Sequence, residues 1–158
     1  MTVAMYPGTF DPATNGHMDI LRRAADIYEE VIVAVADSSS TLFSTEERMQ
    51  LFSDAASDIP NARVISYSGL TIETARDEGA QVLVRGLRAI TDFTAEFDMA
   101  LMNRRMAPDI ESAFLMTAVD HLYVSASRIR ELARFGRDCA DFVPAGVVAG
   151  LKAKFPDR

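Results

Sequence analysis

The stretch Val31-Ile32-Val33-Ala34-Val35-Ala36 decides the fold, because it is an unbroken apolar run dominated by β-branched residues. Strands that are covered on both faces of a parallel sheet have this character. Outward from it, apolar runs alternate with longer amphipathic stretches. Strands are predicted at residues 3–6, 31–36, 62–66, 81–85 and 112–116. Helices are predicted at residues 16–29, from Ser44 onward, and at residues 70–78, 90–105, 127–135 and 145–155.

This alternation of strands and helices predicts βαβ units. We therefore expect an α/β fold with a Rossmann-like, doubly wound, five-stranded parallel sheet, forming a single domain over residues 1–158. In such sheets ligands bind beyond the carboxyl ends of the strands. The loops at residues 7–17, 37–43 and 85–88 each follow a predicted strand, so they are the candidate site loops.

The composition narrows the class of function. The chain has 158 residues, 49% of them hydrophobic, and a net charge of −7, which argues against a nucleic-acid partner. No apolar run is long enough to span a membrane, and Cys139 is the sole cysteine, so no internal disulfide can form. We therefore expect a cytoplasmic protein that binds neither a nucleic acid nor a membrane. A small anionic substrate needs only local positive charge, which Arg85 with Arg88 and Arg128 with Arg130 offer.

The loop Tyr-Pro-Gly-Thr-Phe-Asp-Pro-Ala-Thr-Asn-Gly-His, residues 6–17, carries the most chemical information. Thr14 or Asn15 can cap the following helix, which places His17 in its first turn. Free backbone N–H groups and the helix dipole favour an anion there, and an imidazole can donate to a phosphate oxygen. A lone histidine at a helix start is, however, most often a cap or a solvated residue. The loop matches neither a Walker loop nor a G-x-G-x-x-G fingerprint.

The same loop resembles the T/H-x-G-H signature of a nucleotidyltransferase superfamily, and its full string is similar to the opening of the phosphopantetheine adenylyltransferase family. The similarity continues through Phe-Ser-Thr-Glu-Glu-Arg at residues 43–48 and Val-Arg-Gly-Leu-Arg at residues 84–88. It also includes residues 92–96, 102–104, 124–127 and 142–144, and thus covers almost the whole chain.

The resemblance implies the transfer of AMP from ATP to 4′-phosphopantetheine, giving dephospho-CoA and pyrophosphate in coenzyme A biosynthesis. It further implies Mg²⁺ that accompanies ATP, and a homohexamer. A phosphate monoester is mostly ionised at pH 7, so this acceptor needs no general base. Catalysis is then expected to rest on positioning and charge neutralisation, by direct in-line transfer without a covalent intermediate.

The resemblance also implies the site residues, with His17 as transition-state stabiliser and Thr9 beside it. The expected ATP contacts are Thr9, Phe10, His17, Gly86, Leu87, Arg88, Glu96, His121, Leu122, Tyr123, Val124, Ser125, Ala126 and Ser127. The expected acceptor contacts are Thr9, Thr41, Thr71 and Arg85, and no residue is expected to bind a metal directly. Simpler interpretations remain open: the arginines can form surface ion pairs with Asp92 or Glu96, and His121 can be an ordinary loop residue.

The chain departs from the family pattern in the loop at residues 37–43, which has no lysine where the family usually has one. Thr41 or Ser40 stands nearest to that place. Loss of a charge-assisted contact predicts acceptor binding weaker by about 1.5–3 kcal/mol unless another cation compensates. Thr71 replaces an apolar residue expected beside the pantetheine arm, and Ala126 replaces the middle serine of a serine run.

Two alternative functions remain. One is a cytidylyltransferase or a nicotinamide-mononucleotide adenylyltransferase of the same superfamily, against which the R-G-L-R motif and the short chain argue. The other is a degenerate module that binds a nucleotide without turnover, as the missing lysine allows. Sequence also leaves open whether Met99, Met102 and Met106 belong to the core or to a subunit contact.

Overall fold

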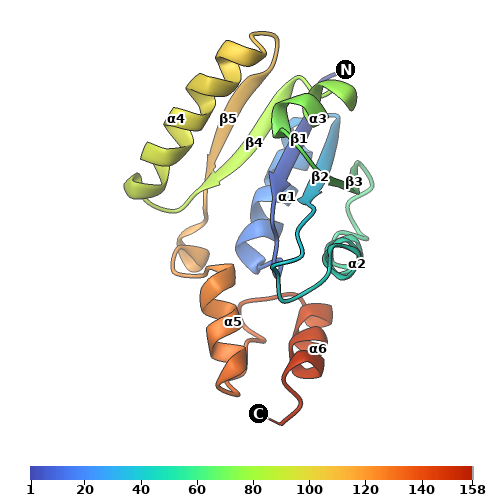
Figure 1. Ribbon diagram of the computed structural model, residues 1–158, viewed down its shortest axis with the longest axis vertical. Helices are drawn as coiled ribbons and strands as arrows, with labels where there is room; N and C mark the ends of the chain where they lie inside the picture. The colour runs from blue at the N-terminus through green and yellow to red at the C-terminus, as the bar shows by residue number, and fades with distance from the viewer. Residues whose placement is uncertain (158) are drawn as a thin grey trace.

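The computed structural model describes residues 1–157; Arg158, the last residue of the predicted domain, and the side chain of Thr91 lie outside the described part. Five parallel strands form one sheet in the order β3-β2-β1-β4-β5 (Figure 1). They are β1 (Val3–Gly8), β2 (Glu30–Ala36), β3 (Ala62–Tyr67), β4 (Val82–Leu87) and β5 (Glu111–Met116). The chain winds outward from β1 to β3, returns to the other side of β1, and continues to β5. The direction of winding therefore reverses between β1 and β4.

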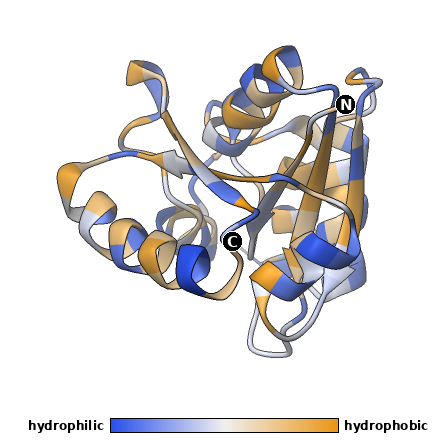
Figure 2. Ribbon diagram, turned by 90° about the horizontal axis from the view of Figure 1, so that it is seen from above, coloured by the Kyte–Doolittle hydropathy of each residue, from blue (hydrophilic) through white to orange (hydrophobic). Residues whose placement is uncertain are grey.

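Helices cover both faces of this sheet, which confirms the predicted α/β fold. They are α1 (Asn15–Ile27), α2 (Thr45–Ala55), α3 (Thr71–Asp77), α4 (Ile90–Met106), α5 (Ala126–Arg134) and α6 (Ala145–Lys154), with a short 3₁₀ helix η1 (Val119–His121). The β2 strand explains the doubly wound arrangement. Its alternate residues Val31, Val33 and Val35 pack with α1 and α2, whereas Ile32 and Ala34 pack with α3 on the other face. Figure 2 shows hydrophobic residues along the central strands.

A third apolar cluster joins α5 and α6 to the loop after β2. Phe43 packs there with Ile129 of α5 and with Val147 and Leu151 of α6. In Figure 1 these two helices lie together beyond the carboxyl ends of the strands. They therefore form a wall at the edge of the sheet where a ligand is expected. None of the described helices combines the length and apolar character that a membrane crossing requires.

Two sequence expectations need correction. The β4 strand does not end at Arg85 but continues to Leu87, because Gly86 and Leu87 pair with Leu115 and Met116 of β5. Arg85 therefore lies within β4, and of the two arginines only Arg88 lies in the loop after the strand. The predicted first helix also ends two residues early, at Ile27.

The helix α4 stands along the β5 edge of the sheet (Figure 1). Large apolar side chains of this helix are exposed, with Ile90, Phe97 and Leu101 exposed by 86%, 47% and 53%. Met99 and Met102 are exposed by 59% and 58%. These methionines are therefore not core residues of the described chain.

Candidate active site

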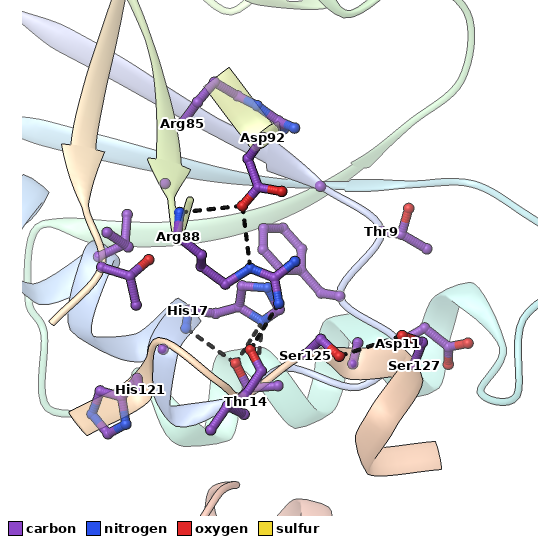
Figure 3. A pocket seen from close by; sticks show the side chains of 18 of the residues that line it. Thr9, Asp11, Thr14, His17, Arg85, Arg88, Asp92, His121, Ser125 and Ser127 are labelled. Carbon is purple, nitrogen blue, oxygen red and sulfur yellow. Dashed lines mark hydrogen bonds and ion pairs between the residues drawn. The ribbon is translucent and has the colours of Figure 1, made fainter. Parts of the chain in front are cut away.

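A cleft of about 790 Å³ opens at the carboxyl ends of β1 and β4, where the strand order reverses. This is the place at which doubly wound sheets bind their ligands. The lining residues are Tyr6, Gly8, Thr9, Phe10, Asp11, Thr14, Gly16, His17, Ile20, Ser38, Ser40, Thr41, Arg85, Gly86, Arg88, Asp92, Ala95, Glu96, Thr117, His121, Val124, Ser125, Ala126, Ser127 and Arg130. Figure 3 shows that the labelled side chains come from the loop after β1 and the start of α1, from the end of β4 and the start of α4, from η1, and from the start of α5.

His17 is both a helix cap and a cleft residue. Thr14 is the N-cap of α1, and its hydroxyl accepts from the backbone N–H of His17 at 3.3 Å. In return, the imidazole Nδ1 accepts from the backbone N–H of Thr14 at 3.0 Å. This reciprocal capping box anchors the ring at the helix start. The simple capping interpretation and the functional one are therefore compatible.

The cap also fixes the proton on the His17 ring. A backbone N–H can only donate, so Nδ1 carries no proton and the neutral ring holds its proton on Nε2. Burial, together with the positive charges of Arg88 and Arg85, lowers the pKa of His17 to about 4. At pH 7 the side chain is therefore a neutral Nε2–H donor. It can stabilise negative charge but cannot act as an imidazolium acid.

Phe10 packs against the ring of His17 and helps to hold it in place. Its ring packs edge-on against His17 with centroids 5.0 Å apart, and against Phe52 at 4.8 Å. The Phe10 backbone has a φ of +52°, which is rare for a bulky residue. Gly8 makes room for the ring, since a Cβ there would lie 2.8 Å from Phe10 Cζ. The glycine of the motif is thus needed for close packing against a neighbouring side chain.

Three arginines and three carboxylates line the cleft, and each arginine has a carboxylate nearby. Arg85 binds Glu96 through two hydrogen bonds of 2.9 and 2.7 Å. The Nε of Arg88 lies 3.7 Å from Asp92, as drawn in Figure 3. The third pair joins Arg130 and Asp11 at 3.8 Å. With His17 neutral, the charged side chains of the cleft therefore sum to zero.

These pairs orient the guanidinium groups without using all their donors. Arg85 gives Nε–H and one Nη2–H to Glu96 and one Nη1–H to the carbonyl of Pro7. One N–H on each terminal nitrogen is left, which suits a phosphate in a two-point contact. Burial works against the charge of Arg85, but Glu96 outweighs it and raises the pKa of the guanidinium. Arg85 therefore stays charged with a fixed orientation.

The start of α5 forms the opposite wall of the cleft. The hydroxyl of Ser125 caps this helix by accepting from the backbone N–H of Arg128 at 3.2 Å. The hydroxyl of Ser127 lies 3.3 Å from that of Ser125. The first-turn N–H groups of a helix lack partners within the helix and favour anions. Arg130, in the next turn, points back to the loop after β1 and donates to the Asp11 carbonyl.

The loop at residues 37–43 forms the remaining side of the cleft and is hydrogen-bonded to the loop after β1. The buried carboxylate of Asp11 accepts from the backbone N–H groups of Leu42 and Phe43 at 2.9 and 3.0 Å. The hydroxyl of Thr41 donates to the Phe43 carbonyl at 2.6 Å. Its single proton is therefore used inside the loop. Ser40 lines the cleft and is the better place for a ligand contact from this loop.

Most of the residues predicted from sequence meet in this cleft, although their roles stay predictions. Those that line it are Thr9, Phe10, His17, Thr41, Arg85, Gly86, Arg88, Glu96, His121, Val124, Ser125, Ala126 and Ser127. Leu87, Thr71, Leu122 and Tyr123 do not. Tyr123 is 65% exposed and packs edge-on against Phe142, whereas Thr71 lines a separate cavity.

Sequence reasoning did not assign Asp11 or Arg130 to the site. The sequence marks Arg130 only as part of a positive cluster with Arg128, and Arg128 is exposed and lies outside the cleft. Helical spacing is the sequence signal that could have placed Arg130 in the site. Arg130 follows Ser127 by three residues and therefore lies on the same side of α5.

Comparison with known proteins places the chain among nucleotidyltransferases. The cytidylyltransferase-like family model matches residues 5–132. A phosphopantetheine adenylyltransferase of Heliobacterium modesticaldum is 48% identical over 159 residues, covering 99% of this chain and 95% of that protein. Another, of Moorella thermoacetica, is 50% identical and covers 98% of each chain. A third, of Desulforudis audaxviator, is 48% identical and covers 100% of this chain and 98% of its own.

The fold has a counterpart among solved structures. A candidate nicotinate-nucleotide adenylyltransferase from Vibrio parahaemolyticus superposes with a TM-score of 0.74. The match covers 100% of this chain and 98% of that chain at 16% sequence identity. At this identity the likeness concerns the fold alone.

Proposed function

The chain belongs to the phosphopantetheine adenylyltransferases of the cytidylyltransferase-like family, and from this premise we propose how its cleft carries out the reaction. The enzyme transfers the adenylyl group of ATP to 4′-phosphopantetheine, giving dephospho-CoA and pyrophosphate. The observation that carries the assignment to this cleft is the convergence of His17, Arg85 and Arg88 with the start of α5.

The chemistry is one displacement at the α-phosphorus of ATP. An oxygen of the acceptor phosphate forms a bond to this phosphorus, and the bond to the β-phosphate oxygen breaks as pyrophosphate leaves. Negative charge builds on the α-phosphate during the transfer, and a neutral Nε2–H donor such as His17 stabilises it. In the cleft the hydroxyl of Thr14 lies 3.3 Å from Nδ1 of His17, but it caps α1 by accepting from the His17 backbone N–H, so we propose direct transfer without a covalent intermediate. We assign the triphosphate to Arg88 and to the start of α5, where Ser125 and Ser127 lie.

We place the pantetheine arm of the acceptor at a second cavity, of about 170 Å³, that shares Arg85 and Glu96 with the cleft. Its wall contains Leu83, Met99 and Phe114, together with Thr71. A phosphate on the free edge of Arg85 would face the cleft while the pantetheine arm, which carries two amide groups, extends toward this cavity, whose wall also holds Asn103 and Ser112. The position of Thr71 is therefore consistent with its predicted contact to the pantetheine arm.

We propose that Arg130 supplies the charge-assisted contact to the acceptor that the missing lysine of the loop at residues 37–43 would otherwise make. It lines the same cleft as Ser40 and contacts the first loop at Asp11. A guanidinium at this place supplies positive charge that the loop at residues 37–43 lacks.

Mg²⁺ fits this site only as a companion of the nucleotide. The described residues hold no group of three or more His, Cys, Asp or Glu side chains arranged for a metal ion. Mg²⁺ commonly binds substrate phosphates and keeps several waters, so the triphosphate itself would supply its ligands. Its chemistry there is charge neutralisation on the phosphates.

We also propose a homohexamer, built in part through α4, and a cytoplasmic location. The exposed side chains of Phe97, Leu101 and Met102 form an apolar surface that a subunit contact would cover. Sedimentation measurements test the assembly, and Leu101→Glu is expected to reduce it. The single free thiol of Cys139 is compatible with a reducing compartment.

The decisive assay measures pyrophosphate release with defined pairs of substrates. We expect turnover with ATP and 4′-phosphopantetheine, and none with CTP or with nicotinamide mononucleotide as acceptor. Turnover with one of those alternatives would replace the proposed acceptor or nucleotide. ATP binding by calorimetry without any turnover would instead indicate a nucleotide-binding module.

A further inference from the structure

Arg48 is a charged residue in the core of the protein, only 1% exposed, on the inner face of α2. Its Nε donates to the carbonyl of Phe43 at 3.2 Å. Its Nη1 donates to the carbonyls of Thr9 and Ala36 at 2.7 and 2.8 Å. Its Nη2 donates to the Ser38 carbonyl at 3.4 Å and to the Thr45 hydroxyl at 3.0 Å. All five N–H groups of the guanidinium are thereby used.

None of the ion pairs found among the described residues involves Arg48. The charge is balanced by backbone carbonyl dipoles and, through the Thr45 hydroxyl, by Asp37, which accepts from that hydroxyl at 2.6 Å. Burying a cation without a direct carboxylate is costly. A residue whose only task was to fill the core would be apolar at this place.

The acceptors of Arg48 belong to the two loops that form the cleft. Thr9 lies in the turn after β1 and lines the cleft, and Ser38 and Phe43 stand near the two ends of the loop at residues 37–43. A second contact joins the same two loops: Asp11, in the loop after β1, accepts from the backbone N–H groups of Leu42 and Phe43. Together these contacts fix how far one loop stands from the other.

We propose that Arg48 is a positioning residue that sets the distance between the turn at Thr9 and the loop at residues 37–43, and so aligns acceptor and nucleotide. The proposal rests on the proposed function, because alignment matters only for a reaction between two bound substrates. In-line displacement is sensitive to such placement, and a displacement of about 1 Å can reduce the rate on the order of 10²-fold.

The test compares Arg48→Lys and Arg48→Met with a control variant that destabilises the fold elsewhere. Lysine keeps the charge but has three donors on one nitrogen, so it cannot reach all five acceptors. Ile110→Ala is the control, since Ile110 is buried on the α3 face next to the amino-terminal end of β5, away from the cleft. The melting temperature of each variant is measured first, so that kcat is compared at a temperature where all variants are folded.

We expect kcat to fall on the order of 10²-fold in Arg48→Met and clearly in Arg48→Lys, with ATP affinity by calorimetry close to wild type. Among the expected ATP contacts, Thr9 and Phe10 lie in the turn that Arg48 holds, but His17, Arg88 and the start of α5 lie in elements that it does not touch, so ATP should still bind. Ile110→Ala is expected to keep its kcat while its melting temperature falls. Equal kcat in the folded Arg48 variants and in this control would overturn the proposal.

Hydrogen exchange gives a readout that needs no turnover. In Arg48→Lys the amides of Leu42 and Phe43 should exchange faster than in wild type, whereas Ile110→Ala should leave them protected. Unchanged protection of these two amides would also overturn the proposal. If the wild-type enzyme shows no turnover with the substrate pair, the proposed function fails, and the exchange experiment alone decides the role of Arg48.

Discussion

The strongest test of the site concerns the protonation of His17. Burial and the two nearby arginines lower its pKa from the ordinary 6.5 to about 4, a difference that corresponds to about 3 kcal/mol against the charged ring. At pH 7 only about one ring in a thousand is then protonated. The folded enzyme should therefore use His17 as a neutral donor throughout its working range.

The effect on stability has a definite sign. Between pH 6.5 and about 4 the unfolded chain binds a proton at this histidine and the folded chain does not, so acid favours unfolding. His17 should thus reduce the free energy of unfolding by about 3 kcal/mol as the pH falls through this window, with no contribution above it. His17→Asn removes this dependence while its amide oxygen can still accept from the backbone N–H of Thr14. Urea denaturation of both proteins from about pH 7 to about pH 4 measures the difference.

Two further readouts complete the test. The chain has two histidines, so nitrogen NMR on wild type and on a His121→Asn variant assigns the His17 ring. We expect a bare Nδ1, a protonated Nε2 and a titration near pH 4. We also expect His17→Asn to lower kcat on the order of 10²-fold while ATP still binds. A ring that titrates at its ordinary value, or that carries its proton on Nδ1, would refute the reasoning.

Three other changes probe the walls of the cleft. Gly8→Ala should displace the Phe10 ring, cost about 1–3 kcal/mol of stability and lower turnover, as measured by denaturation and assay at a temperature where the protein is folded. Arg130→Gln should raise the KM of a phosphate-bearing substrate on the order of tenfold or more, whereas Arg128→Gln should not; equal effects would remove the assigned role. Ser40→Lys should lower the acceptor KM if positive charge is still limiting there, and an unchanged KM would mean that Arg130 already suffices.

Much of the fold follows from local patterns in the sequence. The apolar run at residues 31–36 predicts a strand covered on both faces, and Ile32 and Val33 are each fully buried on opposite sides. The helix caps at Thr14 and Ser44 also follow from residue type and spacing. The end of β4 does not, because glycine at residue 86 reads as a breaker locally. Pairing with β5 overrides this preference.

The site is less predictable, because its contacts join distant parts of the chain. Ion pairs of the two arginines with Asp92 or Glu96 are among the expected interpretations, but which pairs form depends on how α4 folds back after β4, because Arg88 precedes this helix. The sequence pattern marks Arg48 only as part of a helix start. Its spacing of four from the buried Phe52 indicates the inner face of α2, but the carbonyl groups that satisfy it come from loops whose positions the sequence does not give.

The balanced charges of the cleft have a consequence for how substrates arrive. The whole chain carries a net charge of −7, and the ionised side chains around the cleft cancel, so no long-range field draws a polyanion inward. Diffusional encounter with ATP should then be slower than for enzymes with an electropositive funnel. Added salt screens the overall repulsion, so the association rate should rise with ionic strength, opposite to the trend of electrostatically steered enzymes.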